Sequence, residues 1–129
     1  MPNIARRAAA VFLVAHGLAH VLGFIAAWKL GELDDVPYST LILNGTLDVG
    51  DLGIRVVGVL WLAAAIAFLV AAFVVWRRGP TRTVAVLTAF SLAVCLVGLP
   101  ASIIGVSIDV AILAGLLLVR PSAPRPAFQ

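Results

Sequence analysis

This chain has little charge and a single cysteine. Asp, Glu, Lys and Arg make up 12% of its 129 residues, whereas about a quarter of a soluble domain is charged. So little charge cannot cover a water-facing surface, which argues against a soluble enzyme, a nucleic-acid-binding module or a disordered tail. The lone Cys95 excludes an intrachain disulfide and a Cys-based metal cluster.

Apolar residues are abundant instead, at 63% of the chain. Four segments approach the roughly 20 apolar residues that cross a bilayer, namely 8–28, 54–76, 83–99 and 102–119. The last two would be one overlong helix, but Gly98 and Pro100 interrupt it, because proline removes a backbone donor and disfavours helix before it. The sequence therefore predicts an all-α membrane protein, a single four-helix transmembrane domain with an outer loop at 29–53.

The basic residues predict the orientation of these spans. Seven of the nine lie before span 1, between spans 2 and 3, or after span 4, and these three regions share one side of the membrane: Arg6, Arg7, Arg77, Arg78, Arg82, Arg120 and Arg125. Five of the six acids lie in the opposite loop. By the positive-inside rule both termini are cytoplasmic. The preference for Arg over Lys is typical of a GC-rich genome, so we expect a bacterial cytoplasmic membrane protein.

The outer loop contains a hairpin signal. Residues 39–43 and 46–49 flank Asn44-Gly45, a pair that accepts the positive φ angles of a tight β-turn. We expect either a small β-hairpin resting on the outer helix ends or an irregular loop with one turn.

Three ionisable side chains lie inside the predicted spans: His16, His20 and Asp109. Such groups are functional candidates because burying them in lipid is costly. The two histidines are four residues apart and share a helix face, and all three lie near the membrane midplane. The cluster is open to three interpretations: a proton relay, a metal site of imidazole and carboxylate, or hydrogen-bonded packing between helices.

Secondary candidates surround this cluster. Trp61 packs either against it or against lipid, and Asp51 and Arg55 are spaced as an i, i+4 ion pair at the outer end of span 2. A weakly polar stripe on span 3 consists of Thr88, Ser91, Cys95 and Gly98. Hydroxyl groups such as those of Thr88 and Ser91 more often bond their own helix. A stripe of small residues that would permit close helix packing consists of Ala15, Ala19, Gly23 and Ala27.

The first span reads His16-Gly17-Leu18-Ala19-His20-Val21-Leu22-Gly23-Phe24. This stretch resembles an uncharacterised family of small bacterial, often actinobacterial, four-span membrane proteins that carry a His-Gly-x-x-His-x-x-Gly-Phe motif in the first helix. The likeness continues at 43–51, 58–62 and 100–105. Relatives often carry Asn where this chain has Asp109. The resemblance implies the four-span architecture and a bacterial origin, and it implies no mechanism.

Three functions remain open from the sequence. The first is an accessory or binding membrane protein with the His16, His20 and Asp109 cluster at its midplane. The second is a proton-coupled small-molecule transporter working as an oligomer, and the third is a membrane metal-binding or redox subunit. No catalytic motif is visible, so we expect no enzyme. The expected partners are the bilayer and either a second copy or a larger membrane complex, with no nucleic acid. No cofactor is predicted, although a metal ion would fit the cluster.

Overall fold

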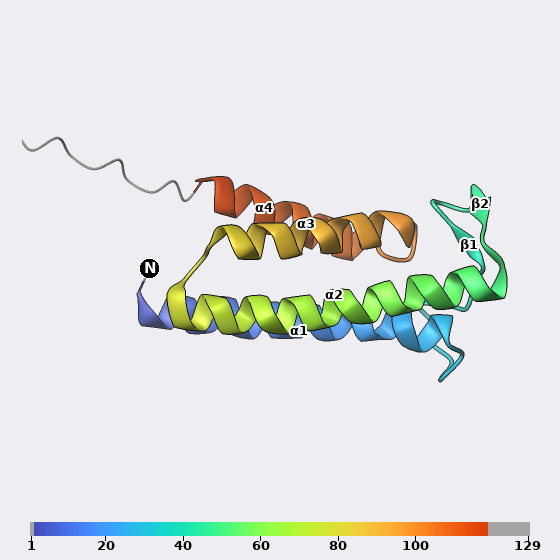
Figure 1. The fold of residues 1–129 in the computed structure, drawn as a ribbon, viewed down its shortest axis with the longest axis horizontal. Coiled ribbons are helices and arrows are strands. Elements are labelled where there is room, and N and C mark those ends of the chain that lie inside the picture. The colour runs from blue at the N-terminus through green and yellow to red at the C-terminus, as the bar shows by residue number, and fades with distance from the viewer. Residues whose placement is uncertain (1, 119–129) are drawn as a thin grey trace, which may run out of the picture.

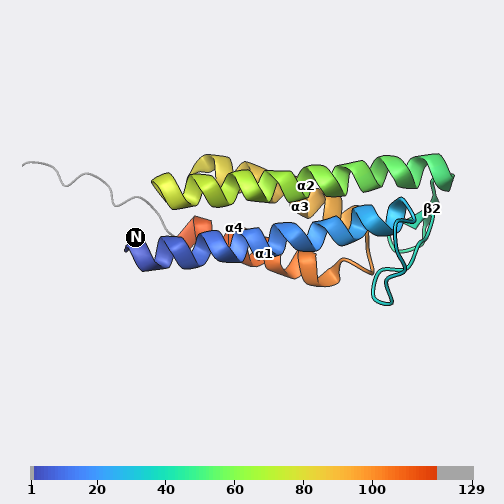
Figure 2. The ribbon, with the colours of Figure 1, turned by 90° about the horizontal axis from the view of Figure 1, so that it is seen from below.

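The structure, a computed structural model, describes residues 2–118 of the chain. Its helices are α1 (Asn3–Ala27), α2 (Gly50–Arg78), α3 (Arg82–Val97) and α4 (Ile103–Leu118). Figure 2 shows α1 and α2 lying side by side, and α3 and α4 form a second layer over them (Figure 1). The described part is therefore all-helical apart from one short hairpin, and the four predicted helices are present.

The helix bounds confirm the break in the long apolar run. α3 ends at Val97 and α4 begins at Ile103, so the chain reverses around Pro100 as predicted. α1 and α2 are long and apolar enough to cross a membrane, while α3 and α4 are shorter apolar helices of 16 residues each. The predicted Arg120, Arg125 and the end of the fourth span at residue 119 lie outside the described residues.

Glycines let the aromatic residues of α2 pack closely against the other helices. A Cβ on Gly23 of α1 would lie 2.5 Å from the Trp61 ring, and a Cβ on Gly98 would lie equally close to the same ring. Directly after the first histidine, a Cβ on Gly17 would lie 2.7 Å from the Cβ of Phe68. These bare backbones create the slots that the indole and phenyl groups of α2 fill.

The predicted stripe of small residues packs along only half of its length. Gly23 and Ala27 are buried against α2, whereas Ala15 and Ala19 are exposed. The expectation of a continuous packing stripe is therefore wrong. The buried face of α1 passes instead through Gly17, which lies between the two histidines in the sequence, and Phe68 packs against it.

The predicted hairpin is present in the outer loop. Strands β1 (Leu41–Ile42) and β2 (Leu47–Asp48) pair antiparallel, with Ile42 opposite Leu47. The Thr46 N–H donates to the Leu43 carbonyl at 3.3 Å, and Asn44 and Gly45 between them have φ angles of 58° and 79°. Positive φ at both central positions is what a type I′ turn requires, so the Asn-Gly signal is confirmed.

This hairpin, residues 41–48, is called the lid below because it covers the turn between α3 and α4. The Leu43 N–H donates to the Val97 carbonyl at 2.9 Å, and the Asn44 N–H donates to the Leu99 carbonyl at 3.0 Å. Carbonyls at the end of a helix have no partner within that helix. Figure 1 shows α3 and α4 stopping short of the outer end of α2, with the hairpin beyond them. The lid therefore satisfies backbone groups that the short helices leave open.

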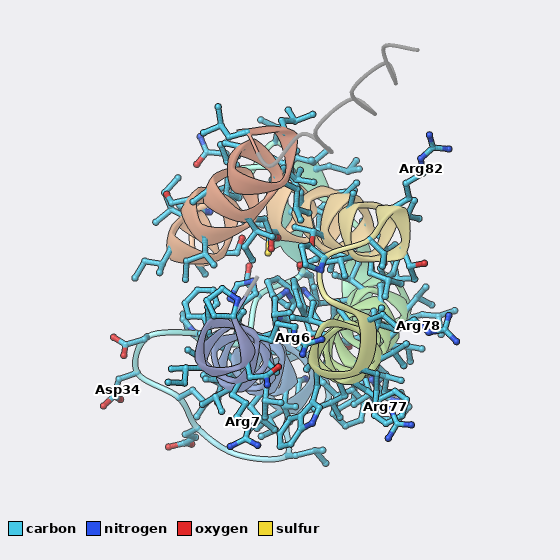
Figure 3. The ribbon with its side chains drawn as sticks, turned by 90° about the vertical axis from the view of Figure 1, so that its left-hand side faces the viewer. Arg6, Arg7, Asp34, Arg77, Arg78 and Arg82 are labelled. Atoms are coloured by element: carbon cyan, nitrogen blue, oxygen red, sulfur yellow. The ribbon has the colours of Figure 1, made fainter. Side chains whose placement is uncertain are left out.

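Charges separate between the two ends of the molecule. Figure 3, viewed along the helices, shows five arginines at the near end, namely Arg6, Arg7, Arg77, Arg78 and Arg82. Asp34 lies in the loop at the other end, where the lid is also found. The described residues thus have the charge asymmetry that the sequence predicted.

The expected pairing of Asp51 with Arg55 is not among the ion pairs of residues 2–118. Asp51 instead lies 3.6 Å from the Lys29 ammonium and accepts a hydrogen bond from the Tyr38 hydroxyl. The guanidinium of Arg55 lies 5.8 Å from the centre of the Trp28 ring. The Trp28 indole N–H also donates to the backbone carbonyl of Arg55, at 3.1 Å. Helix spacing alone therefore indicated the wrong partner for Asp51.

We predict that Gly23→Ala lowers the free energy of unfolding by about 1–3 kcal/mol, because the new methyl group overlaps the Trp61 ring. Unfolding in mild detergent, followed by circular dichroism, measures this. The matched control is Gly115→Ala on α4, where nothing lies within 4 Å of an added Cβ. Equal stability changes in the two variants would contradict the interlocking of glycine and tryptophan.

Candidate functional site

The three ionisable residues predicted as a cluster come together in the structure. His16 Nε2 lies 2.9 Å from Asp109 Oδ1. The rings of His16 and His20 meet edge to face, with centroids 4.9 Å apart. Because His16 and His20 share one face of α1 and Asp109 is on α4, the cluster joins two helices that are distant in the sequence.

Ser91 of α3 connects the second histidine to the acid. Its Oγ lies 2.7 Å from His20 Nε2 and 2.7 Å from Asp109 Oδ2. His20 Nδ1 lies 3.0 Å from the His16 carbonyl oxygen, one turn earlier on α1. The result is a closed hydrogen-bonded network of His16, His20, Ser91 and Asp109, which is called the polar network below.

The polar network is shielded from solvent. Asp109 and Ser91 are 0% exposed, and His20 and His16 are 2% and 6% exposed. Asp109 is the one residue of α4 (Ile103–Leu118) that is classed as buried. An otherwise apolar helix thus turns its single acid, rather than a hydrophobic side chain, toward the interior.

The number of hydrogen-bond donors and acceptors limits which atoms of this network can carry a proton. The His16 carbonyl can only accept, so His20 Nδ1 carries a hydrogen. A serine hydroxyl has one hydrogen to give. If Ser91 donates to a carboxylate at Asp109, His20 Nε2 must donate to Ser91, and His20 is then a cation. If Asp109 is protonated, it donates to Ser91, Ser91 donates to His20 Nε2, and both groups are neutral.

These two arrangements satisfy every hydrogen-bonding atom of the path from Asp109 to His20. To change one arrangement into the other, one proton shifts between Asp109 and Ser91 and a second shifts between Ser91 and His20. The net result is the transfer of one proton between the carboxyl group and the imidazole ring. In both, His16 Nε2–H donates to Asp109 Oδ1. The polar network can therefore hold a proton at either end and pass it through Ser91.

Aromatic and sulfur groups surround the histidines. Phe68 of α2 meets the His16 ring edge to face at 4.6 Å between centroids, and the Trp61 ring centre lies 5.4 Å from that of His20. Cys95 Sγ lies 3.7 Å from His20 Nε2. α2 thus contributes apolar rings at this depth, since its acidic and basic residues lie at its ends, so the titratable groups here are the two histidines, Asp109 and Cys95.

Of the secondary candidate residues, two belong to or contact the polar network and three do not. Ser91 is a central member of the polar network, and Trp61 packs against it. Thr88 donates to the Val84 carbonyl of its own helix at 2.9 Å, as hydroxyls on helices often do. Asp51 and Arg55 lie at the outer end of α2, away from the cluster.

Two neighbours of the cluster were given no site role from the sequence: Phe68 was not named, and Cys95 was named only as part of the polar stripe on span 3. Cys95 follows Ser91 by four residues, and Phe68 follows Trp61 by seven, so helical periodicity places each on the same face as a named candidate. That periodicity was the available signal. It did not indicate which face of α2 would meet α1.

The cluster is also a group that could hold a metal ion. His16, His20 and Asp109 each offer one ligand atom, and these atoms lie within 4.8 Å of one another. A tetrahedral site with bonds of about 2 Å brings its ligands closer than this. The Ser91 oxygen also lies within 2.7 Å of both His20 and Asp109, so hydrogen bonding already occupies the space between two of the three ligands.

A cavity of about 770 Å³ leads from the polar network to the lid. His16, His20 and Cys95 line its inner end, and Tyr38, Ser39 and Asn44 line its outer end. Its volume falls in the range of about 300–1,000 Å³ that is typical of small-molecule sites. The histidine rings are thus accessible from the outer half of the molecule although they are nearly fully buried.

Comparisons with known proteins add no identification. No family model matches the chain, and no curated protein or solved structure matches it. The assignment of function therefore rests on the geometry of the site.

We predict that Ser91→Ala lowers the free energy of unfolding by about 1–3 kcal/mol, because it leaves His20 Nε2 and Asp109 Oδ2 buried without their shared partner. Ser107→Ala on α4 is the control, since Ser107 is exposed and donates only to the Ile103 carbonyl of its own helix. Thermal unfolding in one detergent compares the two, and a Ser91 variant as stable as the control would show that the network is not energetically connected.

Proposed function

We propose that this chain is a four-span integral protein of a bacterial cytoplasmic membrane and that it binds a small ligand in the cavity beside the polar network. Both termini lie in the cytoplasm, and the protein is not itself an enzyme. The bilayer is the partner that its composition requires. Association with a second copy or a larger membrane complex remains a prediction from the sequence.

The separation of charge supports the four-span arrangement. Five arginines gather at one end of the described chain and the acidic loop lies at the other, as expected when the arginine end faces the cytoplasm. α3 and α4 rise about 24 Å each, less than the ~30 Å hydrocarbon core. Backbone outside a helix is tolerated at membrane depth where protein covers it, and the lid supplies that cover for the turn between them.

The connection between the cavity and the histidines carries the binding proposal. A membrane protein that used these residues only to hold its helices together would gain nothing from an open path to them. Here the same two rings that bind Ser91 and Asp109 also form the inner wall of a cavity large enough for a small molecule. Polar groups placed at the end of an otherwise apolar pocket are the usual means of orienting a ligand.

Ligand-induced stabilisation tests this proposal. The probes are 4-hexylphenol, 4-hexylanisole, hexylammonium and hexanoate, added to the purified protein in nanodiscs during thermal unfolding. We expect at least one probe to raise the unfolding temperature, because a ligand that binds only the folded state stabilises it.

A pair of cavity variants makes that test specific. Ala19→Phe places a ring in the cavity and abolishes the stabilisation. Ala15→Phe, one turn away and also exposed but outside the cavity, preserves it. Stabilisation by no probe, or by the same probe in both variants, would contradict binding in this cavity.

A proton-coupled transporter is the second candidate, and the Asp109–Ser91–His20 path favours it. Ser91→Ala breaks that path, while Thr88→Ala on the same helix removes a buried hydroxyl that bonds only its own backbone. We expect proteoliposomes of the wild type and of Thr88→Ala to dissipate a pH gradient faster than those of Ser91→Ala. Equal rates for all three would exclude proton movement through the network.

A metal-binding or redox subunit receives less support, because Ser91 already bridges two of the three candidate ligands. We expect elemental analysis of tag-free protein to find no stoichiometric metal. One metal ion per chain that is lost in Asp109→Asn would contradict this expectation and favour the metal-binding function over the other two.

We predict the membrane topology from the same charge pattern. In a Cys95→Ser background, Glu32→Cys in the outer loop should react with a membrane-impermeant maleimide in intact cells. Pro80→Cys, between α2 and α3 at the arginine end, should react only after the cells are opened. Labelling of both positions in intact cells, or the reverse pattern, is incompatible with the proposed orientation.

A further inference from the structure

The cavity is lined in part by side chains that are exposed on the outside of the helices. Its wall includes Leu22 of α1 and Ile104 of α4, which are 41% and 72% exposed on the outside of the molecule. Exposed Ala19 lies on the same wall, three residues before Leu22. Figure 3 shows α1 and α4 as neighbouring helices on one side of the molecule. In a bilayer, the cavity would therefore open to the acyl chains between these two helices.

The lining offers almost no charge to a ligand. Asp35, in the loop at the outer end, is its one acidic residue, and no Lys or Arg lines it. The walls between the lid and the histidines are mostly alanine, glycine and aliphatic side chains, together with the Trp61 ring, Cys95 and Ser102. A charged ligand would lose its hydration there without gaining a partner, which favours a neutral molecule with an apolar body.

The hydrogen bonds that the histidines already make determine which polar group a ligand would need. His20 uses both of its ring nitrogens within the polar network, and His16 uses Nε2. His16 Nδ1 has no hydrogen bond among the described residues and is not one of their fully buried unpartnered atoms. When the His16 ring is neutral and its Nε2–H donates to Asp109, Nδ1 carries a lone pair and can only accept.

We infer that the cavity binds a neutral, lipid-soluble hydroxyl compound, which enters sideways from the bilayer between α1 and α4 and donates its O–H to His16 Nδ1. The inference rests on the proposed binding function and adds the chemical class of the ligand. A ketone, ether or hydrocarbon of the same shape lacks the hydrogen that this nitrogen accepts. The flat Trp61 ring, fixed between Gly23 and Gly98, provides an aromatic wall for a phenolic ring.

Fluorescence quenching with a matched pair of probes tests the inference. The protein carries Trp28→Phe and Trp76→Phe, so that Trp61 is its one indole, and is reconstituted in nanodiscs. The probes are 2-bromo-4-hexylphenol and its methyl ether, which have nearly the same shape and differ in the donor hydrogen. We expect the phenol to quench Trp61 at about tenfold lower concentration than the ether, the worth of one hydrogen bond.

Variants assign that difference to the cavity and to His16. Ala19→Phe is expected to abolish strong quenching by the phenol, while Ala15→Phe retains it. His16→Phe is expected to bring the phenol and the ether to equal potency. If His16→Phe fails to fold, the comparison of the two probes on the parent protein still decides the question.

The outcomes distinguish this inference from the binding proposal. Equal quenching by phenol and ether, or stronger stabilisation by hexylammonium or hexanoate than by 4-hexylphenol, overturns the hydroxyl assignment and leaves binding in place. Quenching that is the same in Ala19→Phe and Ala15→Phe places the probes in bulk lipid and overturns both. Preference for the phenol that depends on both Ala19 and His16 supports the inference.

Discussion

The position of α4 depends on one carboxyl group. Asp109 is fully buried, accepts from His16 of α1 and is bonded to Ser91 of α3, while the other side chains of α4 are partly or fully exposed. In a bilayer, burying apolar side chains gives little advantage, because lipid tails are as apolar as the helix interface. A polar group, by contrast, is costly to leave unpaired in lipid. We therefore regard the polar network as the interaction that selects this arrangement of helices.

The cavity is a consequence of the same constraint. α1 and α4 meet at the polar network, and Ala19, Gly23 and Gly105 line the cavity between that level and the lid. Gly23 and Gly98 hold the Trp61 ring at the side of this space, and the lid closes its outer end by bonding the carbonyls after α3. Structure and proposed function thus share residues: the histidines that anchor α4 are also the groups that a ligand meets.

The sequence predicted the helices, the break at Pro100, the Asn-Gly turn and the approach of His16, His20 and Asp109, because each rests on a strong local rule. It did not predict which hydroxyl joins the cluster. Thr88 and Ser91 are nearly equivalent in sequence, and only the rotation of α3 decides that Ser91 faces Asp109. The pairing of Asp51 with Lys29 and the exposure of Ala15 and Ala19 were likewise beyond local spacing, since they depend on how neighbouring segments pack.

A double-mutant cycle between His16 and Asp109 measures how strongly this pair of side chains holds α4 in place. The variants His16→Phe, Asp109→Leu and the double variant are unfolded reversibly in the same detergent, and their free energies of unfolding are compared with that of the wild type. We expect a coupling energy of at least about 1 kcal/mol, because each single change leaves a buried polar partner behind. A coupling energy indistinguishable from zero would show that contacts other than the polar network hold α4.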